Sequence, residues 1–260
     1  MTREHWFKPF VATSAALGWI ALALQFYLSL QLSIAHGNGV FGGLVIYFSF
    51  FTILTNFLVA LALTASLLRV RSSVVEFFTR PGVNTGIAAS IALVGIAYAL
   101  LLQHLWHPEG LQLVADMLLH YVMPSLFLVY WWVAVPRGDA RWTSVFAWML
   151  YPVLYFVYAM TRGALSGVYP YPFINAAEMG YGQALANALE VLMGFVAFAL
   201  LLVAVGRFKG RATSSFAVRR PRPCADSRRR REYGGSLQEG NRPFLAKERR
   251  SRTDGGDDVQ

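Results

Sequence analysis

The sequence predicts an all-α integral membrane protein, a bundle of six transmembrane helices with a disordered basic C-terminal tail. Of the 260 residues, 56% are hydrophobic and only 14% are charged, whereas a soluble domain carries about 25% charged residues. Several apolar runs also exceed the roughly 18–20 residues that cross about 30 Å of hydrocarbon. The expected spans are residues 10–32, 44–68, 83–102, 111–135, 142–160 and 184–205.

The first apolar run follows Arg3 and Lys8, and a secretory signal peptide also begins with basic residues. However, this run is longer than the roughly 7–15 apolar residues of a signal sequence, and no small-residue cleavage site follows it. We therefore expect a retained first helix, with a cleaved signal peptide as the alternative.

Basic residues alternate between the connections and predict the orientation. The first and third connections have no Lys or Arg, and the fifth has only Arg162, close to its span. Cytoplasmic loops carry an excess of basic residues, so we expect a multi-pass protein of the plasma (cytoplasmic) membrane with both termini in the cytoplasm. The residues that mark the second and fourth connections are Arg69, Arg71, Arg80, Arg137 and Arg141.

Residues 206–260 form a tail of different composition, rich in Arg, Gly, Ser and Pro. Such a segment cannot bury enough apolar surface to fold alone, so residues 1–205 are the expected membrane domain. Basic runs occur in nucleic-acid-binding proteins as well, but behind six spans we expect the tail to lie on anionic lipid headgroups and expect no nucleic acid. The single cysteine, Cys224, excludes an intrachain disulfide.

Polar side chains recur at helical spacing within three of the apolar runs. Lipid cannot satisfy them, so they should face the bundle interior. At 1.5 Å per residue, Thr52 and His120 lie about 12–13 Å below the outer ends of their spans, and Glu190 about 9 Å. Together they predict a polar pocket that opens toward the outer side. The three stripes are Ser49, Thr52, Thr55 and Asn56; Gln112, Asp116 and His120; and Gln183, Asn187 and Glu190.

Asp116 and His120 lie one helical turn apart and suggest catalysis. The carboxylate can hold one imidazole nitrogen and leave the other free as a base, as in a catalytic triad. Pro124 lacks a backbone donor, so the His120 carbonyl should lose its helical partner and the helix should kink there. The alternative is a structural pair that holds two helices together.

Thr52 is the candidate nucleophile, because an adjacent base activates a hydroxyl. The alternative is a threonine that only bonds back to the preceding turn. Asn56 is the candidate donor to the oxyanion, and Thr55 and Asn187 are expected to line the pocket. Glu190 is expected to pair with Arg162, either for function or as a structural ion pair.

The connections before spans four and six are rich in aromatic residues and proline, at residues 106–108 and 169–173. Tyr and Trp favour the membrane interface, so these segments are either an aromatic belt or a lid over the pocket. No phosphate-binding loop, metal-binding His motif or nucleophile elbow is present. We therefore expect no cofactor and no metal.

Two segments resemble a known family. Residues 47–56 (YFSFFTILTN) and 106–132 (WHPEGLQLVADMLLHYVMPSLFLVYWW) resemble a bacterial family of predicted six-transmembrane proteins. More distantly, Phe51-Thr52 and the His120 segment resemble the androgen-induced and androgen-dependent membrane hydrolases of animals. Those are six-span threonine hydrolases of fatty acid esters of hydroxy fatty acids. The resemblance implies that Thr52 is the nucleophile and His120 the base.

The preferred hypothesis is therefore an intramembrane hydrolase of lipid esters, with Asp116 orienting His120. Its expected partners are membrane lipids and a lipid-ester or other amphipathic small-molecule substrate. A proton-coupled carrier is the first alternative, because Asp, Glu and His within spans also form proton relays. A noncatalytic lipid-binding scaffold is the second.

Overall fold

The computed structural model describes residues 3–136 and 142–217, and within these ranges every regular element is a helix. The all-α class is confirmed. The long helices are α1 (Arg3–Ala35), α3 (Phe51–Leu67), α5 (Pro81–Ala97), α7 (Met123–Ala134), α8 (Ser144–Ser166) and α9 (Ala176–Ala217). Shorter pieces are α2 (Gly39–Tyr47), α4 (Ser73–Thr79), α6 (Gly110–Met117), the π-helical turns η1 (Tyr98–Leu102) and η2 (Leu118–Val122), and the 3₁₀ turn η3 (Pro172–Ile174).

The spans agree with a polytopic membrane protein. Within the described residues, five helical stretches are long and apolar enough to cross a bilayer. Helices α2 and α3, with an angle of 74° between them, form a sixth span if the bent pair counts as one. The predicted tail begins too early, because α9 continues as a helix through Ala217. The rest of the expected tail, 218–260 with Cys224, lies outside the described residues, as do Arg137 and Arg141.

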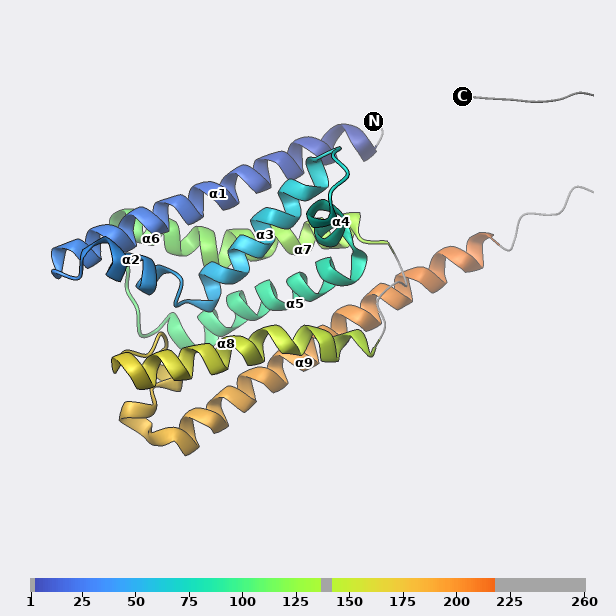
Figure 1. Cartoon of the computed structure of the whole chain (residues 1–260). Coiled ribbons are helices and arrows are strands. Elements are labelled where there is room, and N and C mark those ends of the chain that lie inside the picture. Colours follow the sequence, from blue (N-terminus) through green and yellow to red (C-terminus); the bar gives the residue numbers. More distant parts are fainter. Residues whose placement is uncertain (1–2, 137–141, 218–260) are drawn as a thin grey trace, which may run out of the picture. The chain divides into compact units, whose positions relative to one another are not determined.

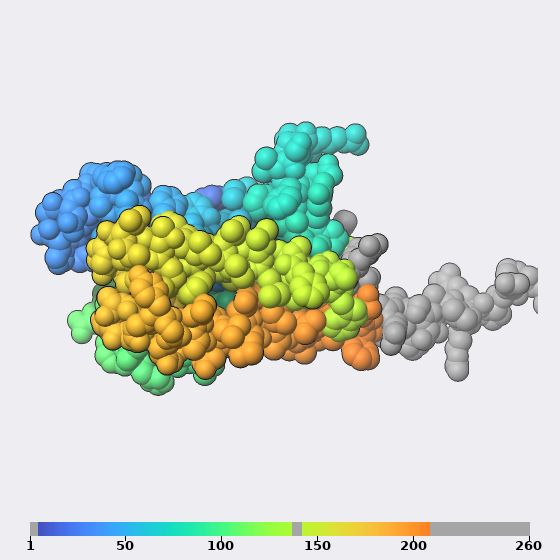
Figure 2. All heavy atoms as spheres, turned by 60° about the horizontal axis from the view of Figure 1, so that its bottom comes forward, coloured from blue at the N-terminus to red at the C-terminus, as the bar shows by residue number. Residues whose placement is uncertain are grey.

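Helices α3 and α5 lie at the centre of the bundle. Helix α1 packs along α2 and α3, and α5 packs against α3, α7 and α9 (Figure 1). In the most apolar stretch of α5, 56% of the residues are buried, whereas the corresponding value for α8 is 11%. Helix α8 is therefore peripheral and presents most of its surface to the surroundings, and α9 lies beside it (Figure 2).

The second span breaks between α2 and α3, at residues 48–50. Irregular backbone at membrane depth is tolerated only where protein groups satisfy it, and α8 supplies those groups. The Tyr155 hydroxyl donates to the Ser49 carbonyl at 2.9 Å, and the Tyr158 hydroxyl donates to the Phe48 carbonyl at 3.5 Å. As a result, α3 starts inside the bundle and Thr52 lies in its first turn.

The helix that carries His120 is distorted near Pro124, as the sequence predicts. The distortion is the π-helical turn η2, which includes His120 and ends directly before α7. Single π turns inside α-helices are frequent at functional sites. Gly95 of α5 lies against this turn, since a Cβ atom there would be only 3.1 Å from the His120 carbonyl oxygen. Glycine at this position allows α5 to approach the turn closely.

Candidate functional site

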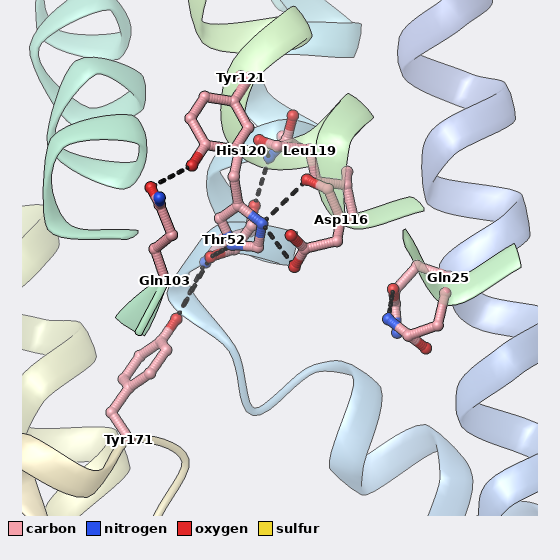
Figure 3. Close-up of polar contacts among 10 residues, drawn as sticks. Gln25, Thr52, Gln103, Asp116, Leu119, His120, Tyr121 and Tyr171 are labelled. Atoms are coloured by element: carbon pink, nitrogen blue, oxygen red, sulfur yellow. Dashed lines mark hydrogen bonds and ion pairs between the residues drawn. The ribbon is translucent and has the colours of Figure 1, made fainter. Parts of the chain in front are cut away.

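Thr52 and His120 meet although 68 residues separate them (Figure 3). The Thr52 Oγ1 atom is 3.2 Å from His120 Nε2. On the other side of the ring, Nδ1 is 3.1 Å from the Asp116 carbonyl oxygen and 3.2 Å from Asp116 Oδ1. A carbonyl oxygen only accepts hydrogen bonds, so Nδ1 carries the proton. In this tautomer Nε2 is the acceptor that faces the threonine hydroxyl, as a general base must.

The surroundings fix the imidazole ring in place. Tyr98, in the π turn η1, stacks on His120 with ring centroids 4.0 Å apart and an angle of 20° between the planes. Thr52 and Asp116 are buried, with 7% and 4% of their surfaces exposed. The predicted contact between Asp116 and His120 is confirmed, and Thr52 lies directly beside His120.

Tyr171 completes the contacts of Thr52. Its hydroxyl oxygen is 3.4 Å from the Thr52 backbone nitrogen, which donates to it, and 3.4 Å from Thr52 Oγ1. The Thr52 N–H belongs to the first turn of α3, where backbone donors have no partner within the helix and the helix dipole favours negative charge. A phenol and a helix N-terminus thus lie beside the hydroxyl, and both stabilise an oxyanion.

Tyr171 remains a proton donor in this position. It lies in the connection between α8 and α9, outside the spans, and burial raises the pKa of its phenol above the usual value. Asn187 holds this connection in place, because its side-chain amide donates to the Phe173 carbonyl at 2.8 Å. Gln183 in turn donates to the Asn187 side-chain oxygen at 2.8 Å. The third polar stripe therefore anchors the loop that carries Tyr171.

Asn56 does not have the geometry of an oxyanion donor. Its side-chain nitrogen donates to the Thr52 carbonyl at 2.9 Å and to the Leu119 carbonyl at 3.2 Å. Both of its N–H bonds are thus committed to backbone oxygens, and the residue is fully buried. Asn56 instead ties the first turn of α3 to η2, which holds Thr52 opposite His120.

Three other expected site residues lie elsewhere. The Thr55 hydroxyl is 2.9 Å from the Tyr151 hydroxyl and joins α3 to α8. Arg162 donates to the Val168 carbonyl at 2.7 Å. Glu190 is exposed and, among the described residues, forms no salt bridge. The expected pair of Glu190 and Arg162 is therefore wrong, and neither residue lines the cavities described below.

Two cavities meet at the cluster, and Thr52, His120, Tyr98 and Tyr171 line both. The first, of about 250 Å³, lies between α5, α8 and α9 and is called the α9-side cavity. Its α9 lining is Leu185, Ala188, Leu189, Val191 and Leu192. The second, of about 810 Å³, is called the α1-side cavity. Its α1 lining is Gln25, Leu28, Ser29, Gln31, Leu32 and Ala35.

Both aromatic connections contribute to these walls, Trp106 to the α1-side cavity and Tyr171 to both. This arrangement fits the lid alternative better than a simple aromatic belt. The sequence reasoning did not single out Tyr171 or Tyr98 as site residues. The only available signal for Tyr171 was its position in a Tyr- and Pro-rich segment directly before a span that carries a polar stripe.

Comparisons of the chain with protein-family models, with curated proteins and with solved structures give no match. The interpretation of the site therefore depends on its own geometry.

Proposed function

We propose that the protein is an intramembrane threonine hydrolase that cleaves lipid esters. The observation that carries this proposal is the chain of contacts from the Thr52 hydroxyl through the His120 ring to Asp116. This is the order of nucleophile, base and orienting group that activates a hydroxyl. Thr52 Oγ1 contacts His120 Nε2 and the Tyr171 hydroxyl. These contacts argue against the alternative in which the hydroxyl bonds only to the preceding turn.

The reaction proceeds in two balanced steps. First, Thr52 Oγ1 bonds to the acyl carbon while its proton passes to His120 Nε2. The ester C–O bond then breaks, and His120 returns the proton to the leaving alcohol. Second, a water molecule attacks the acyl-threonine ester and gives a proton to His120, which passes it to Thr52 Oγ1 as the free acid leaves. The Tyr171 hydroxyl and the Thr52 N–H stabilise the oxyanion in each step.

The location of the site favours a lipid substrate. The nucleophile lies between helices that are long and apolar enough to span a bilayer, and its α9-side cavity has almost entirely apolar walls. The resemblance to the animal membrane hydrolases points to the same class, fatty acid esters of hydroxy fatty acids. We further propose residence in the plasma membrane with both termini in the cytoplasm, so that the site opens from the outer leaflet.

Labelling with a fluorophosphonate probe tests the proposal. Wild type should be labelled, and Thr52→Ala and His120→Ala should lose the label at equal levels of folded protein. Thr64→Ala is the matched control, because Thr64 lies on the same helix, bonds back to the Ala60 carbonyl and lines neither cavity. Equal labelling of wild type and Thr52→Ala would refute the assignment. An unlabelled wild type with solute uptake that requires Asp116 would favour the carrier.

A further inference from the structure

We infer that the two cavities divide the substrate, with the acyl chain in the α9-side cavity and the alcohol portion in the α1-side cavity. The inference rests on the proposed function and specifies the orientation in which the site holds its ester substrate.

The nucleophile lies between the two cavities. Thr52 and His120 line both, so an ester carbonyl at Thr52 must extend one arm into each. Asp116 lines only the α1-side cavity. The two arms of the substrate therefore meet walls of different chemistry, and an ester with different arms fits best in one orientation.

The α9-side cavity suits a plain hydrocarbon chain. Apart from Thr52, His120 and three tyrosines, its lining is aliphatic or Phe and Pro. Leu185 and Leu189 line it and are also 60% and 55% exposed on the surface of α9. The cavity thus reaches the lipid-facing surface where α8 and α9 run side by side (Figure 2). An acyl chain can pass from the bilayer into this cavity without leaving an apolar environment.

The α1-side cavity is larger and carries polar groups. Gln112 of α6 donates to the Gln25 side-chain oxygen on α1 at 2.9 Å, and Gln25 donates to the Ser29 hydroxyl at 3.4 Å. These three side chains and Asp116 lie on its wall. A polar site rejects a substrate that leaves its groups unpaired. We therefore assign to this cavity an alcohol that carries a hydroxyl, carboxylate or similar group.

The order of the reaction favours the same assignment. After the alcohol leaves, the acyl chain stays bonded to Thr52 and keeps its cavity filled. Water must then reach His120 through the cavity that the alcohol has left. Water occupies a cavity when polar partners are present, and the Gln25 and Gln112 wall provides them.

Crosslinking of wild type gives the most direct test. The probe is a long-chain fluorophosphonate with a diazirine at the end of its alkyl chain, which bonds to Thr52 and reports the position of the chain. Crosslinks to peptides of α8 or α9 are expected, and crosslinks confined to α1 or α6 would overturn the inference. Absence of any Thr52 labelling would refute the proposed function and the inference with it.

Two variants test the division by substrate preference. Ala188→Phe narrows the α9-side cavity and should lower the ratio of kcat/KM for long-chain over acetyl esters by about tenfold or more. Ala186→Phe, exposed on the same helix and outside both linings, is the matched control and should leave this ratio unchanged. Gln25→Leu should lower the ratio of kcat/KM for esters of polar alcohols over esters of plain alkyl alcohols by a similar factor. If active enzyme shows the opposite pattern, the division is wrong and the hydrolase proposal stands.

Discussion

Replacement of Tyr171 by Phe measures how much the Tyr171 hydroxyl contributes to stabilising the oxyanion in the transition state. The change removes one oxygen, which lies 3.4 Å from both the backbone nitrogen and Oγ1 of Thr52. Loss of one oxyanion donor lowers kcat by about 10²–10³, or about 2.7–4 kcal/mol. The ring still fills its place between Phe50 and Phe173, so the loop should keep its position. KM should change little, because the phenol acts mainly on the transition state.

The assay is steady-state hydrolysis of a lipid ester in detergent micelles, with kcat and KM determined separately. Tyr151→Phe is the matched control, because that phenol is 2.9 Å from the Thr55 hydroxyl and Tyr151 lines neither cavity. It should cost about 1 kcal/mol of stability, since one buried hydrogen bond is lost, with a much smaller effect on kcat. Equal kcat losses in the two variants, or a kcat for Tyr171→Phe close to wild type, would refute the assigned role.

Three further predictions follow from the contacts around the site. Asn56→Leu removes the side-chain donor of the Leu119 carbonyl, whereas the Thr52 carbonyl keeps its backbone donor within α3. Stability should fall by about 1–3 kcal/mol, and kcat should fall because Thr52 is no longer tied to η2; thermal unfolding and hydrolysis measure the two changes. Gly95→Ala places a methyl 3.1 Å from the His120 carbonyl; since a misplacement of about 1 Å costs about 10²-fold, a shift of a few tenths should lower kcat several-fold, and an unchanged kcat would contradict this. Burial raises the pKa of Tyr171 above its value of about 10 in the unfolded chain. The stability that this shift contributes is fully present below about pH 10 and is lost as pH rises through the folded pKa. Above about pH 10 the Tm of wild type should therefore fall more steeply than that of Tyr171→Phe.

The sequence predicts those features of the site that depend on spacing within one helix. Asp116 and His120 are four residues apart, so any helix brings them together, and the contact is present. The level of Thr52 relative to His120 follows from the rise per residue and the ends of the apolar runs. The class of the fold follows from the length and composition of those runs.

Contacts that depend on the packing of distant segments were not predictable in this way. Tyr171 reaches Thr52 across 119 residues, and nothing in its local pattern specifies that partner. The break at 48–50 contains neither Gly nor Pro, so no sequence signal marks it. Asn56 was assigned to the wrong partner because periodicity gives the face of a helix but not which atoms on that face already have hydrogen bonds.

The break in the second span explains why a nucleophile can be activated at this depth. In a continuous helix, the Thr52 N–H would bond to a carbonyl one turn earlier and would be unavailable to a substrate. Because α3 begins at Phe51, that N–H points out of the helix end toward Tyr171. The hydroxyls of Tyr155 and Tyr158 satisfy the carbonyls that the break releases. Helix α8 thus stabilises the irregular backbone on one side, and the helix end that results supplies the oxyanion donor on the other.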